Sequence, residues 1–250
     1  MLSAPTLAQL KEVDPDRCRA AVFGAKVQRE ALELLYAFHY ELAKVPELVS
    51  EPMIGQIRYQ WLRDALAEIY ERRAVRQHEI ATPLAALLTS RDIPRFWCDQ
   101  LIDGRERDLD STPFGSLAEA KGYCRQTSGV LMQIAVKVLG AEPNEAVLDL
   151  GESWGLTGLA RSYGYYDKGI LSLIDYRDIC QEATRQYETA QAGLGELQSQ
   201  AFPALAYGAL ISKYLKKLTH KSHDPASQMV SYSPLAKRLD LLGAVIKGKV

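Results

Sequence analysis

The sequence predicts an all-α protein, and three observations lead to that prediction. Apolar residues recur at three- and four-residue intervals along most of the 250 residues, which is the spacing of one helix face. Helix-start signals, such as Asp14-Pro15 and Ser116 with Glu119, precede several of these segments. No segment alternates apolar and polar residues between turn residues, so we expect no β-sheet.

The composition is that of a globular protein in water. Apolar residues make up 47% of the chain and charged residues 24%, which is ordinary for this class. A formal net charge of -1 argues against a general nucleic-acid binder. The four cysteines lack metal-site spacing, which indicates buried thiols in a reducing compartment. We expect one domain over residues 1–250, with a helical core of about 14–218 and a basic amphipathic tail of about 219–250.

The first three predicted helices follow from capping residues and prolines. The first begins at Asp14 and ends near Gly24, and the second covers about 27–42 and ends before Pro46. The third restarts at Pro52. Its inward stripe is predicted to be Ile54, Ile57, Trp61, Ala65 and Ile69.

Further helices follow along the chain, for a predicted total of eight or nine. Short ones start at Thr82 and Asp92, and a long one runs from Ser116 to Gly140. The remaining helices are predicted at about 148–160, 175–197, 204–218 and from Pro234 onwards. The helix at 148–160 contains Gly151, Gly155 and Gly158, which indicate close approach of another helix or of a ligand; we favour helix packing.

Two polar segments are read as surface features. Acidic residues and arginines alternate in residues 103–110, without the spacing of a calcium loop, and we expect a solvated, salt-bridged loop that includes Arg105 and Arg107. In the last helix, an apolar face lies among basic residues, so the helix either lies on an anionic membrane or packs as a terminal helix. That face consists of Leu235, Leu239, Leu242 and Ile246.

No leader peptide and no run of about 18 apolar residues is present, which predicts a cytoplasmic protein with peripheral contact at the inner face of a membrane.

Five short motifs occur in an order typical of one family, the squalene/phytoene synthases, which this chain resembles. The motifs are Arg29 with LYAF at 35–38, RYQWLRDAL around Trp61, LIDGRERDL at 101–109, YCRQTSG at 123–129 and GLTGLAR ending at Arg161.

The resemblance implies an all-α fold that joins two prenyl diphosphates through magnesium held by two D-x-x-x-D motifs. Two carboxylates four residues apart share a helix face and suit this oxygen-loving cation. Here the first motif falls on Ala43 or Lys44 and on Glu47, with a proline between them, and the second falls on Ser162 and Tyr166. We therefore expect no bound metal and no cofactor.

The stretch from Glu41 to Tyr70 is similar to a branch of the family represented by the sixth mitochondrial complex I assembly factor, regarded as having lost synthase activity. We therefore predict a catalytically inactive binding or assembly protein, with a subunit or assembly protein of the respiratory NADH dehydrogenase as its partner. Two alternatives stay open. One is an active magnesium-dependent prenyltransferase using Glu41, Glu47 and Asp167, and the other is a carrier of an isoprenoid or another lipid.

A ligand pocket for a diphosphate or a lipid headgroup is predicted from the arginines, because guanidinium groups match phosphate geometry. Salt bridges to neighbouring carboxylates are the alternative role of these side chains. Tyr123 aligns with a catalytic tyrosine of the family, and its alternative role is a core position with a tied hydroxyl. The candidate ligand-binding residues are Arg29, Glu41, Arg58, Arg63, Tyr123 and Arg161.

Overall fold

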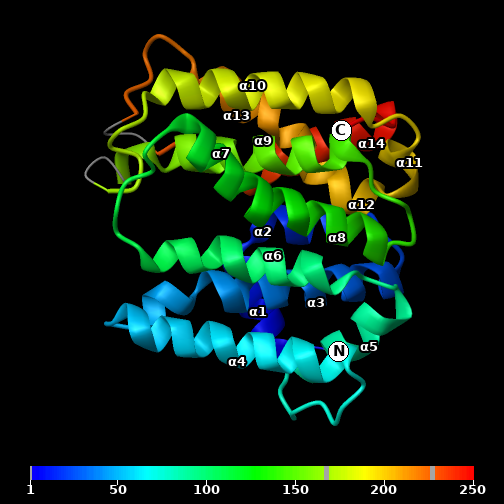
Figure 1. Cartoon of the computed structure of the whole chain (residues 1–250). Coiled ribbons are helices and arrows are strands. Elements are labelled where there is room, and N and C mark those ends of the chain that lie inside the picture. Colours follow the sequence, from blue (N-terminus) through cyan, green and yellow to red (C-terminus); the bar gives the residue numbers. More distant parts are fainter. Residues whose placement is uncertain (1, 166–168, 226–228) are drawn as a thin grey trace.

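The computed structural model describes residues 2–165, 169–225 and 229–250, and these residues form helices without any strand. The predicted all-α fold is confirmed. Figure 1 shows α4, α6, α9 and α10 in successive layers across the molecule. The α-helices are α1 (Ala4–Val13), α2 (Pro15–Ala21), α3 (Lys26–Ala43), α4 (Pro52–Tyr70), α5 (Ala81–Ser90), α6 (Arg95–Glu106), α7 (Leu117–Cys124), α8 (Val130–Val138), α9 (Glu145–Arg161), α10 (Tyr176–Gly193), α11 (Leu197–Gln200), α12 (Phe202–Leu205), α13 (Leu210–Leu218) and α14 (Pro234–Lys247).

Short turns of other helix types divide segments that the sequence predicts as single helices. A π-helical turn, η3 (Arg125–Gly129), separates α7 from α8, and a 3-10 turn, η5 (Ala206–Ala209), separates α12 from α13. The described residues therefore contain more helices than the eight or nine predicted. Insertions of π-helix are rare and concentrate at functional sites, and η3 lies in the layer next to α9.

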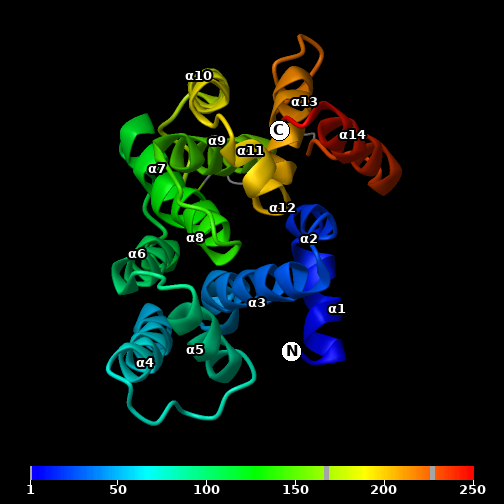
Figure 2. The same ribbon diagram turned by 90° about the vertical axis from the view of Figure 1, so that its right-hand side faces the viewer.

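Helix α9 is the centre of the fold, and most of its side chains are buried. It packs against α7, α8, α10, α13 and η3, and Figure 2 shows it enclosed among them. A Cβ atom at Gly151 would lie 2.6 Å from the Cα of Gly129, and one at Gly155 would lie 2.8 Å from the Cβ of Cys124. The prediction of close helix packing is therefore confirmed at these two glycines. A Cβ at Gly158 would meet no atom within 4 Å.

Helix α3 ends as the sequence predicts, because Pro46 has no N–H to continue the helical hydrogen bonds. The N–H of Lys44 still donates to the carbonyl of Tyr40 at 3.0 Å. The chain then tightens into a 3-10 turn, η1 (Val45–Leu48). This turn carries Glu47, one of the family's metal-motif positions, away from the axis of α3.

The predicted inward stripe of α4 is wrong over its first half. Ile54, Ile57 and Trp61 are exposed, and the helix buries Tyr59 and Leu66 instead. The tyrosine hydroxyl donates to the carbonyls of Leu42 and Arg105 at 3.0 and 2.9 Å, and a satisfied hydroxyl permits burial of the whole ring. Ala65 and Ile69 are buried as predicted.

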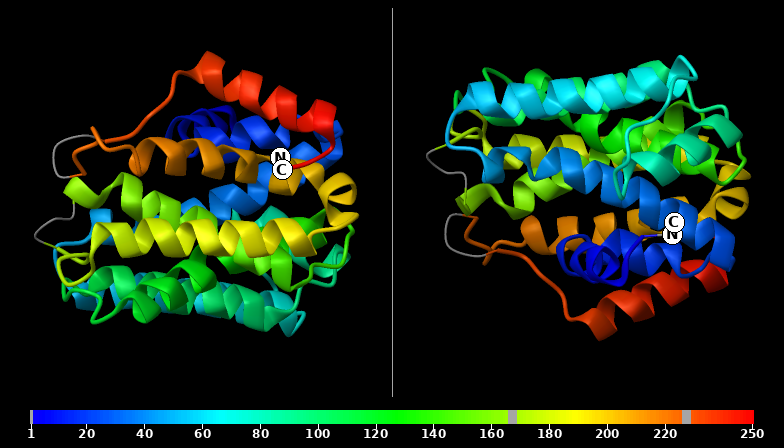
Figure 3. Two further views of the ribbon diagram at one scale, coloured as in Figure 1. Left: turned by 90° about the horizontal axis from the view of Figure 1, so that it is seen from above. Right: turned by 90° about the horizontal axis from the view of Figure 1, so that it is seen from below.

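Helix α14 lies at the outer edge of the bundle (Figure 3) and contacts α2, α13 and η5. It is anchored by an ion pair in which the Lys237 ammonium lies 2.8 Å from both carboxylate oxygens of Asp16. Leu241 and Ala244 are buried on the same face. The predicted apolar stripe lies on the opposite face, where Leu235, Leu239, Leu242 and Ile246 are all exposed.

Candidate functional site

A polar cavity of about 240 Å³ lies between α2, α3, α6, α7, η3 and α9. It is the hollow that gathers positions of the family's motifs. Its lining combines two arginines, a histidine and several hydroxyl groups with one indole ring. The lining residues are Arg17, His39, Arg105, Tyr123, Cys124, Thr127, Ser128, Trp154, Gly155, Gly158, Leu159 and Ser162. We call it the central cavity.

Arg105 ties three of the surrounding elements together. Its guanidinium donates to the Tyr123 hydroxyl at 2.8 Å and to Asp108 at 3.0 Å. Its other terminal nitrogen lies 3.0 Å from Nε2 of His39. The buried Nε atom has no hydrogen-bond partner among the described residues, so one charged donor of this side chain is left over.

Arg17 forms the other cationic wall and is only 6% exposed. One of its terminal nitrogens lies 2.8 Å from Asp14, which belongs to the turn between α1 and α2. The guanidinium also lies over the rings of Tyr36 and Tyr207, at 5.9 and 5.1 Å from their centroids, a favourable cation–π arrangement. Its Nε atom is likewise buried and has no partner within the described chain.

The positive charges of these arginines influence the pKa values of the neighbouring His39 and Tyr123. Burial, together with the charges of Arg105 and Arg17, holds the pKa of His39 well below its usual value. His39 is therefore neutral and accepts the hydrogen bond from Arg105. Burial raises the pKa of Tyr123, against the effect of Arg105, so its phenol keeps its proton.

The structure places the first-motif positions outside the central cavity. Ala43 is the last residue of α3, and Lys44 caps the helix. The Lys44 ammonium forms an ion pair with Glu41, one turn earlier on α3. Glu47 is exposed on η1. These residues therefore do not form a pair of carboxylates on one helix face.

Of the second-motif positions, Ser162 lines the central cavity just beyond the end of α9. Tyr166 and Asp167, which the enzymatic alternative uses, lie outside the described residues. Tyr123, which the family resemblance marks as catalytic, both lines the cavity and holds its hydroxyl against Arg105.

The four arginines that the sequence predicts as ligand-binding lie elsewhere. Arg29 lies 4.0 Å from Glu33 on the outer side of α3, and Arg58 is exposed on α4. Arg63 links α4 to α6 through Glu106 and Asp103, at 2.6 and 2.5 Å. Arg161 donates to the carbonyl of Val230 at 3.1 Å and stacks on the Tyr214 ring. The salt-bridge alternative therefore describes Arg29 and Arg63, and Arg161 holds the C-terminal segment.

The sequence did not identify Arg17, Arg105 and His39 as site residues. The expected salt bridges of Arg105 and Arg107 are present, but Arg105 belongs to α6 and lines the cavity rather than lying in a solvated loop. Arg105 follows Leu101 and Ile102 by four and three residues, so it shares their helix face, and both are fully buried. Arg17 precedes the buried Ala20 and Ala21 by the same spacing. An arginine on an apolar helix face was the signal that could have found both.

The magnesium that the resemblance implies does not fit this cavity. Magnesium prefers carboxylate and other oxygen ligands, whereas the described lining residues contain two guanidinium groups and no carboxylate. Within the same described part of the chain, no three His, Cys, Asp or Glu side chains are grouped to hold a metal ion. A cation beside Arg17 and Arg105 would be repelled by both.

The cavity is also small for the carrier alternative. Its volume of about 240 Å³ is below the roughly 300–1,000 Å³ of pockets that hold drug-sized ligands. Trp154 fills the space beside it and packs edge-on against Tyr207 and Tyr214. A larger hollow of about 690 Å³ lies between α10 and the end of α13, away from the motif positions, and its lining mixes charges of both signs.

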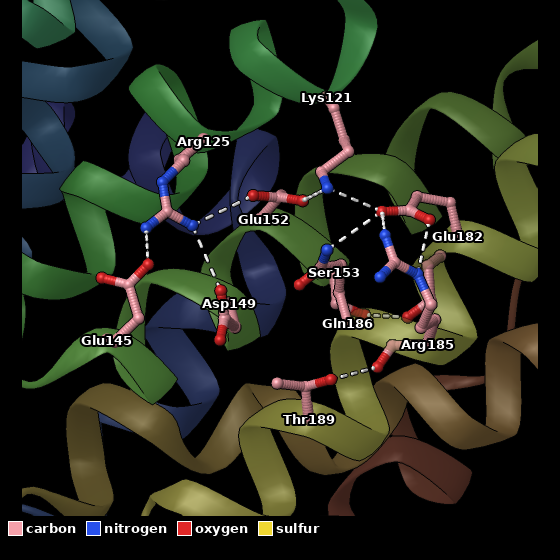
Figure 4. Close-up of polar contacts among 11 residues, drawn as sticks. Lys121, Arg125, Glu145, Asp149, Glu152, Ser153, Glu182, Arg185, Gln186 and Thr189 are labelled. Carbon is pink, nitrogen blue, oxygen red and sulfur yellow. Dashed lines mark hydrogen bonds and ion pairs between the residues drawn. The ribbon is translucent and has the colours of Figure 1, made fainter. Parts of the chain in front are cut away.

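A second polar core lies between α7, η3, α9 and α10, and Figure 4 shows its contacts. Arg125 on η3 pairs with Asp149 and Glu152 at 3.1 and 3.2 Å and also with Glu145. On its other side, Lys121 lies 2.8 Å from Glu182 and 3.6 Å from Glu152. We call this set the charge network. Each of its cations has carboxylate partners, which indicates a structural role.

The carboxylates of the charge network have shifted pKa values. Burial raises the pKa of Glu152, which is 1% exposed, and Arg125 opposes that shift. The pKa of Glu182 is lowered to about 2, because Arg185, Lys121 and Gln186 together outweigh its burial. The network thus holds its charges by mutual compensation.

Comparison with known proteins places the chain among proteins of this architecture. The sequence profile of the squalene/phytoene synthases matches residues 10–173. The crystal structure of a dehydrosqualene synthase in complex with ligand superposes with a TM-score of 0.73 at 13% identity, covering 98% of this chain and 96% of that chain. The squalene synthase HpnC from Alicyclobacillus acidocaldarius gives 0.65 at 11% identity, covering 97% and 92%. At these identities the structural likeness shows the fold.

The similar curated proteins have a different kind of name. NADH dehydrogenase (ubiquinone) complex I, assembly factor 6 of Mus musculus is 26% identical over 234 residues, which are 81% of this chain and 69% of that protein. The protein of the same name from Homo sapiens is 23% identical over 227 residues, 78% and 67% of the two chains. The homologue from Dictyostelium discoideum is 22% identical over 144 residues, 56% and 40% of the two chains.

Proposed function

The chain belongs to the squalene/phytoene synthase family, and from that premise we propose that it is a non-catalytic member that acts in assembly of the respiratory NADH dehydrogenase. The observation that carries this proposal is the chemistry of the central cavity. Two guanidinium groups face it, and no carboxylate is found among its described lining residues.

The charges around the cavity do not suit synthase activity. Departure of a diphosphate from a prenyl chain develops negative charge that a metal ion neutralises in such enzymes. The ligands for such an ion are missing at Ala43 and Ser162, and Lys44 pairs with Glu41. Tyr123 remains in the cavity, where its hydroxyl accepts a hydrogen bond from Arg105.

The assembly role is supported by the names of the similar curated proteins, which are complex I assembly factors. The partner in this role is a subunit or an assembly protein of the respiratory complex. Cells that lack the protein are expected to contain less assembled NADH dehydrogenase, measured on native gels, and expression of the chain should restore it. An unchanged amount of the assembled enzyme would contradict the assembly role.

Catalysis is tested with the purified chain. We expect no condensed hydrocarbon when it is incubated with farnesyl or geranylgeranyl diphosphate and Mg²⁺ and the products are extracted and separated. Formation of a head-to-head product would overturn the non-catalytic assignment, and would direct attention to Asp167 as a metal ligand.

We also propose that α14 lies on the inner, cytoplasmic face of an anionic membrane. Its exposed stripe of four large apolar side chains lies opposite the face that docks on the bundle, and exposed apolar patches of this kind mark contact surfaces. The exposed cations Arg238, Lys247 and Lys249 flank the stripe, which favours an anionic lipid surface. No helix within the described ranges is long and apolar enough to span a bilayer.

Sedimentation with lipid vesicles tests this contact. The chain is expected to bind vesicles that contain phosphatidylglycerol more strongly than vesicles of phosphatidylcholine alone, and Leu239→Glu with Leu242→Glu should abolish binding. The control is Leu173→Glu, at a leucine outside α14 that is also exposed. Equal binding of the α14 variant and the control would refute the membrane contact.

A further inference from the structure

We propose that the central cavity binds a phosphate group, as inorganic phosphate or as a phosphate monoester, directly on the guanidinium groups of Arg17 and Arg105 and without a metal ion. This inference goes beyond the assembly role and does not depend on it, because it rests on the donors that the cavity presents.

The described lining of the cavity has many hydrogen-bond donors and few acceptors. Arg17, Arg105 and the hydroxyl groups of Tyr123, Ser128 and Ser162 all border it. A phosphate dianion only accepts hydrogen bonds, and the planar fork of a guanidinium matches two of its oxygens at once. The lining is therefore complementary to a phosphate group in both charge and hydrogen bonding.

The two arginines also have donors to spare. The Nε atoms of Arg17 and Arg105 are buried and have no hydrogen-bond partner in the described part of the chain. A buried charged donor without a partner is costly, and native structures rarely keep one without a reason. The hydrogen bonding of both side chains is therefore incomplete in the described part of the chain, and both side chains line the cavity that an oxyanion would enter.

The carboxylates near these arginines do not cancel their effect in the cavity. Asp14 and Asp108 each contact one arginine, but neither lines the cavity. The described lining holds two guanidinium groups and no carboxylate, so the potential in the cavity is positive. A positive potential in a partly enclosed, low-dielectric space attracts anions.

The size of the cavity limits the ligand. About 240 Å³ accommodates a phosphate group with a short substituent, and Trp154 and Leu159 close its apolar side. Gly158 faces open space, since a Cβ there would meet no atom within 4 Å. A larger side chain at this position would therefore occupy the ligand's volume without displacing protein atoms near the backbone.

Direct titration calorimetry with inorganic phosphate at constant ionic strength tests the proposal. The full chain is expected to bind one phosphate saturably in the millimolar range or tighter, with and without EDTA. Gly158→Leu should weaken binding by about tenfold or more, a loss of about 1.4 kcal/mol. Gly122→Leu is the matched control, because it replaces an exposed helical glycine that also has open space at its Cβ, and it should bind as the wild type does.

A second pair of variants protects the test against loss of folding. Arg105→Lys keeps the positive charge and removes the fork, and Arg105→Met removes both, so affinity should fall in that order while circular dichroism stays helical. The proposal is overturned if no saturable binding is seen, if binding requires Mg²⁺, or if Gly158→Leu binds as tightly as Gly122→Leu. None of these readouts involves prenyl condensation, so this failure is distinct from failure of the proposed function.

Two further probes identify the source of the phosphate group. Glycerol 3-phosphate and short-chain phosphatidic acid carry the same phosphomonoester dianion on a soluble and on a lipid molecule. Tighter binding of the former than of inorganic phosphate indicates a soluble metabolite, and tighter binding of the latter indicates a lipid headgroup. If Gly158→Leu binds either probe as the wild type does, that probe binds elsewhere and its binding does not support the central site.

Discussion

The central cavity and the charge network each contain a partly buried arginine, Arg105 in the cavity and Arg125 in the network, and the two arginines differ in their partners. In the charge network, Arg125 contacts three carboxylates from α9. In the central cavity, Arg105 contacts one carboxylate, one neutral histidine and one phenol. One arginine is fully compensated by protein groups, and the other retains charge and an unused donor.

This difference separates a structural core from a binding site. Buried ions require partners, and a core that supplies all of them is complete in the folded chain. A core in which a cation lacks some of its protein partners can bind an anion. The charge network joins α7, η3, α9 and α10 into one unit, and α7, η3 and α9 also line the central cavity.

The largest expected effect on stability is that of removing Arg125, which leaves carboxylates of the charge network without this cation. Arg125→Met leaves the carboxylate of Glu152, which is 1% exposed, with Lys121 as its remaining cation. We expect a loss of about 3–5 kcal/mol in the free energy of unfolding, measured with urea. Arg105→Met should cost only about 1–2 kcal/mol, because its lost contacts are mainly to neutral groups. Equal losses would remove the distinction between the two cores.

A smaller effect is expected at the glycines of α9. Gly151→Ala places a Cβ 2.6 Å from backbone atoms of Gly129 and Ser128, and such overpacking costs about 1–3 kcal/mol. Gly158→Ala, on the same helix but facing the cavity, should stabilise by up to about 1 kcal/mol through helix propensity. Thermal or urea unfolding of both variants measures the difference, and a destabilised Gly158→Ala would mean that the cavity is closed there.

His39 in the central cavity is expected to contribute to the pH dependence of stability near neutrality. The folded-state pKa of His39 is depressed by burial and by Arg105 and Arg17, so the unfolded chain takes up the proton first as pH falls. Its contribution is therefore complete above about pH 6.5 and is lost as pH falls below it, by up to about 1.4 kcal/mol per pH unit.

This contribution is measured by urea unfolding of the wild type and of His39→Gln between pH 7 and pH 5, from the change in the free energy of unfolding of each protein with pH. The variant is expected to show a shallower fall in stability with acid. The control is His220→Gln at an exposed histidine, which leaves His39 in place and should keep the wild-type slope. A His39→Gln slope as steep as that of the wild type would show that His39 is not buried as the neutral form.

The helices and the packing of α9 were predictable from local sequence. The span of α3 follows from apolar periodicity and Pro46, and the close packing at Gly151 follows from a glycine that weakens its own helix. The family motifs also predict the all-α architecture, because short motifs and their order can be recognised in the sequence without knowledge of any tertiary contact.

The cavity arginines and the docking face of α14 were not predictable in that way. Arg105 lies in a run of alternating charges that reads as solvated, and its burial depends on Tyr123 and His39, which are distant in sequence. Helix α14 offers an apolar stripe and a face with Lys237, and Asp16, more than 200 residues away, decides which one docks. Pairing across such separations is a tertiary property.

The smallest expected effect is that of replacing Arg29, which the sequence predicts as ligand-binding, and it is compared with the replacement of Arg17, which lines the cavity. Arg29 is 38% exposed on its side chain and lies 4.0 Å from Glu33, and an exposed pair of this kind contributes about 0–1 kcal/mol. Arg29→Met should therefore change stability little and leave phosphate affinity unchanged, whereas Arg17→Met should reduce that affinity by about tenfold or more.

Titration calorimetry of both variants with inorganic phosphate makes the comparison under one set of conditions. Arg29 is the right control because it carries the same charge on the adjacent helix, so a general loss of positive charge would affect both variants alike. If Arg29→Met weakens binding as much as Arg17→Met does, the anion is attracted by the overall charge of the α2–α3 region. If only Arg17→Met weakens it, the binding energy comes from the guanidinium that borders the cavity.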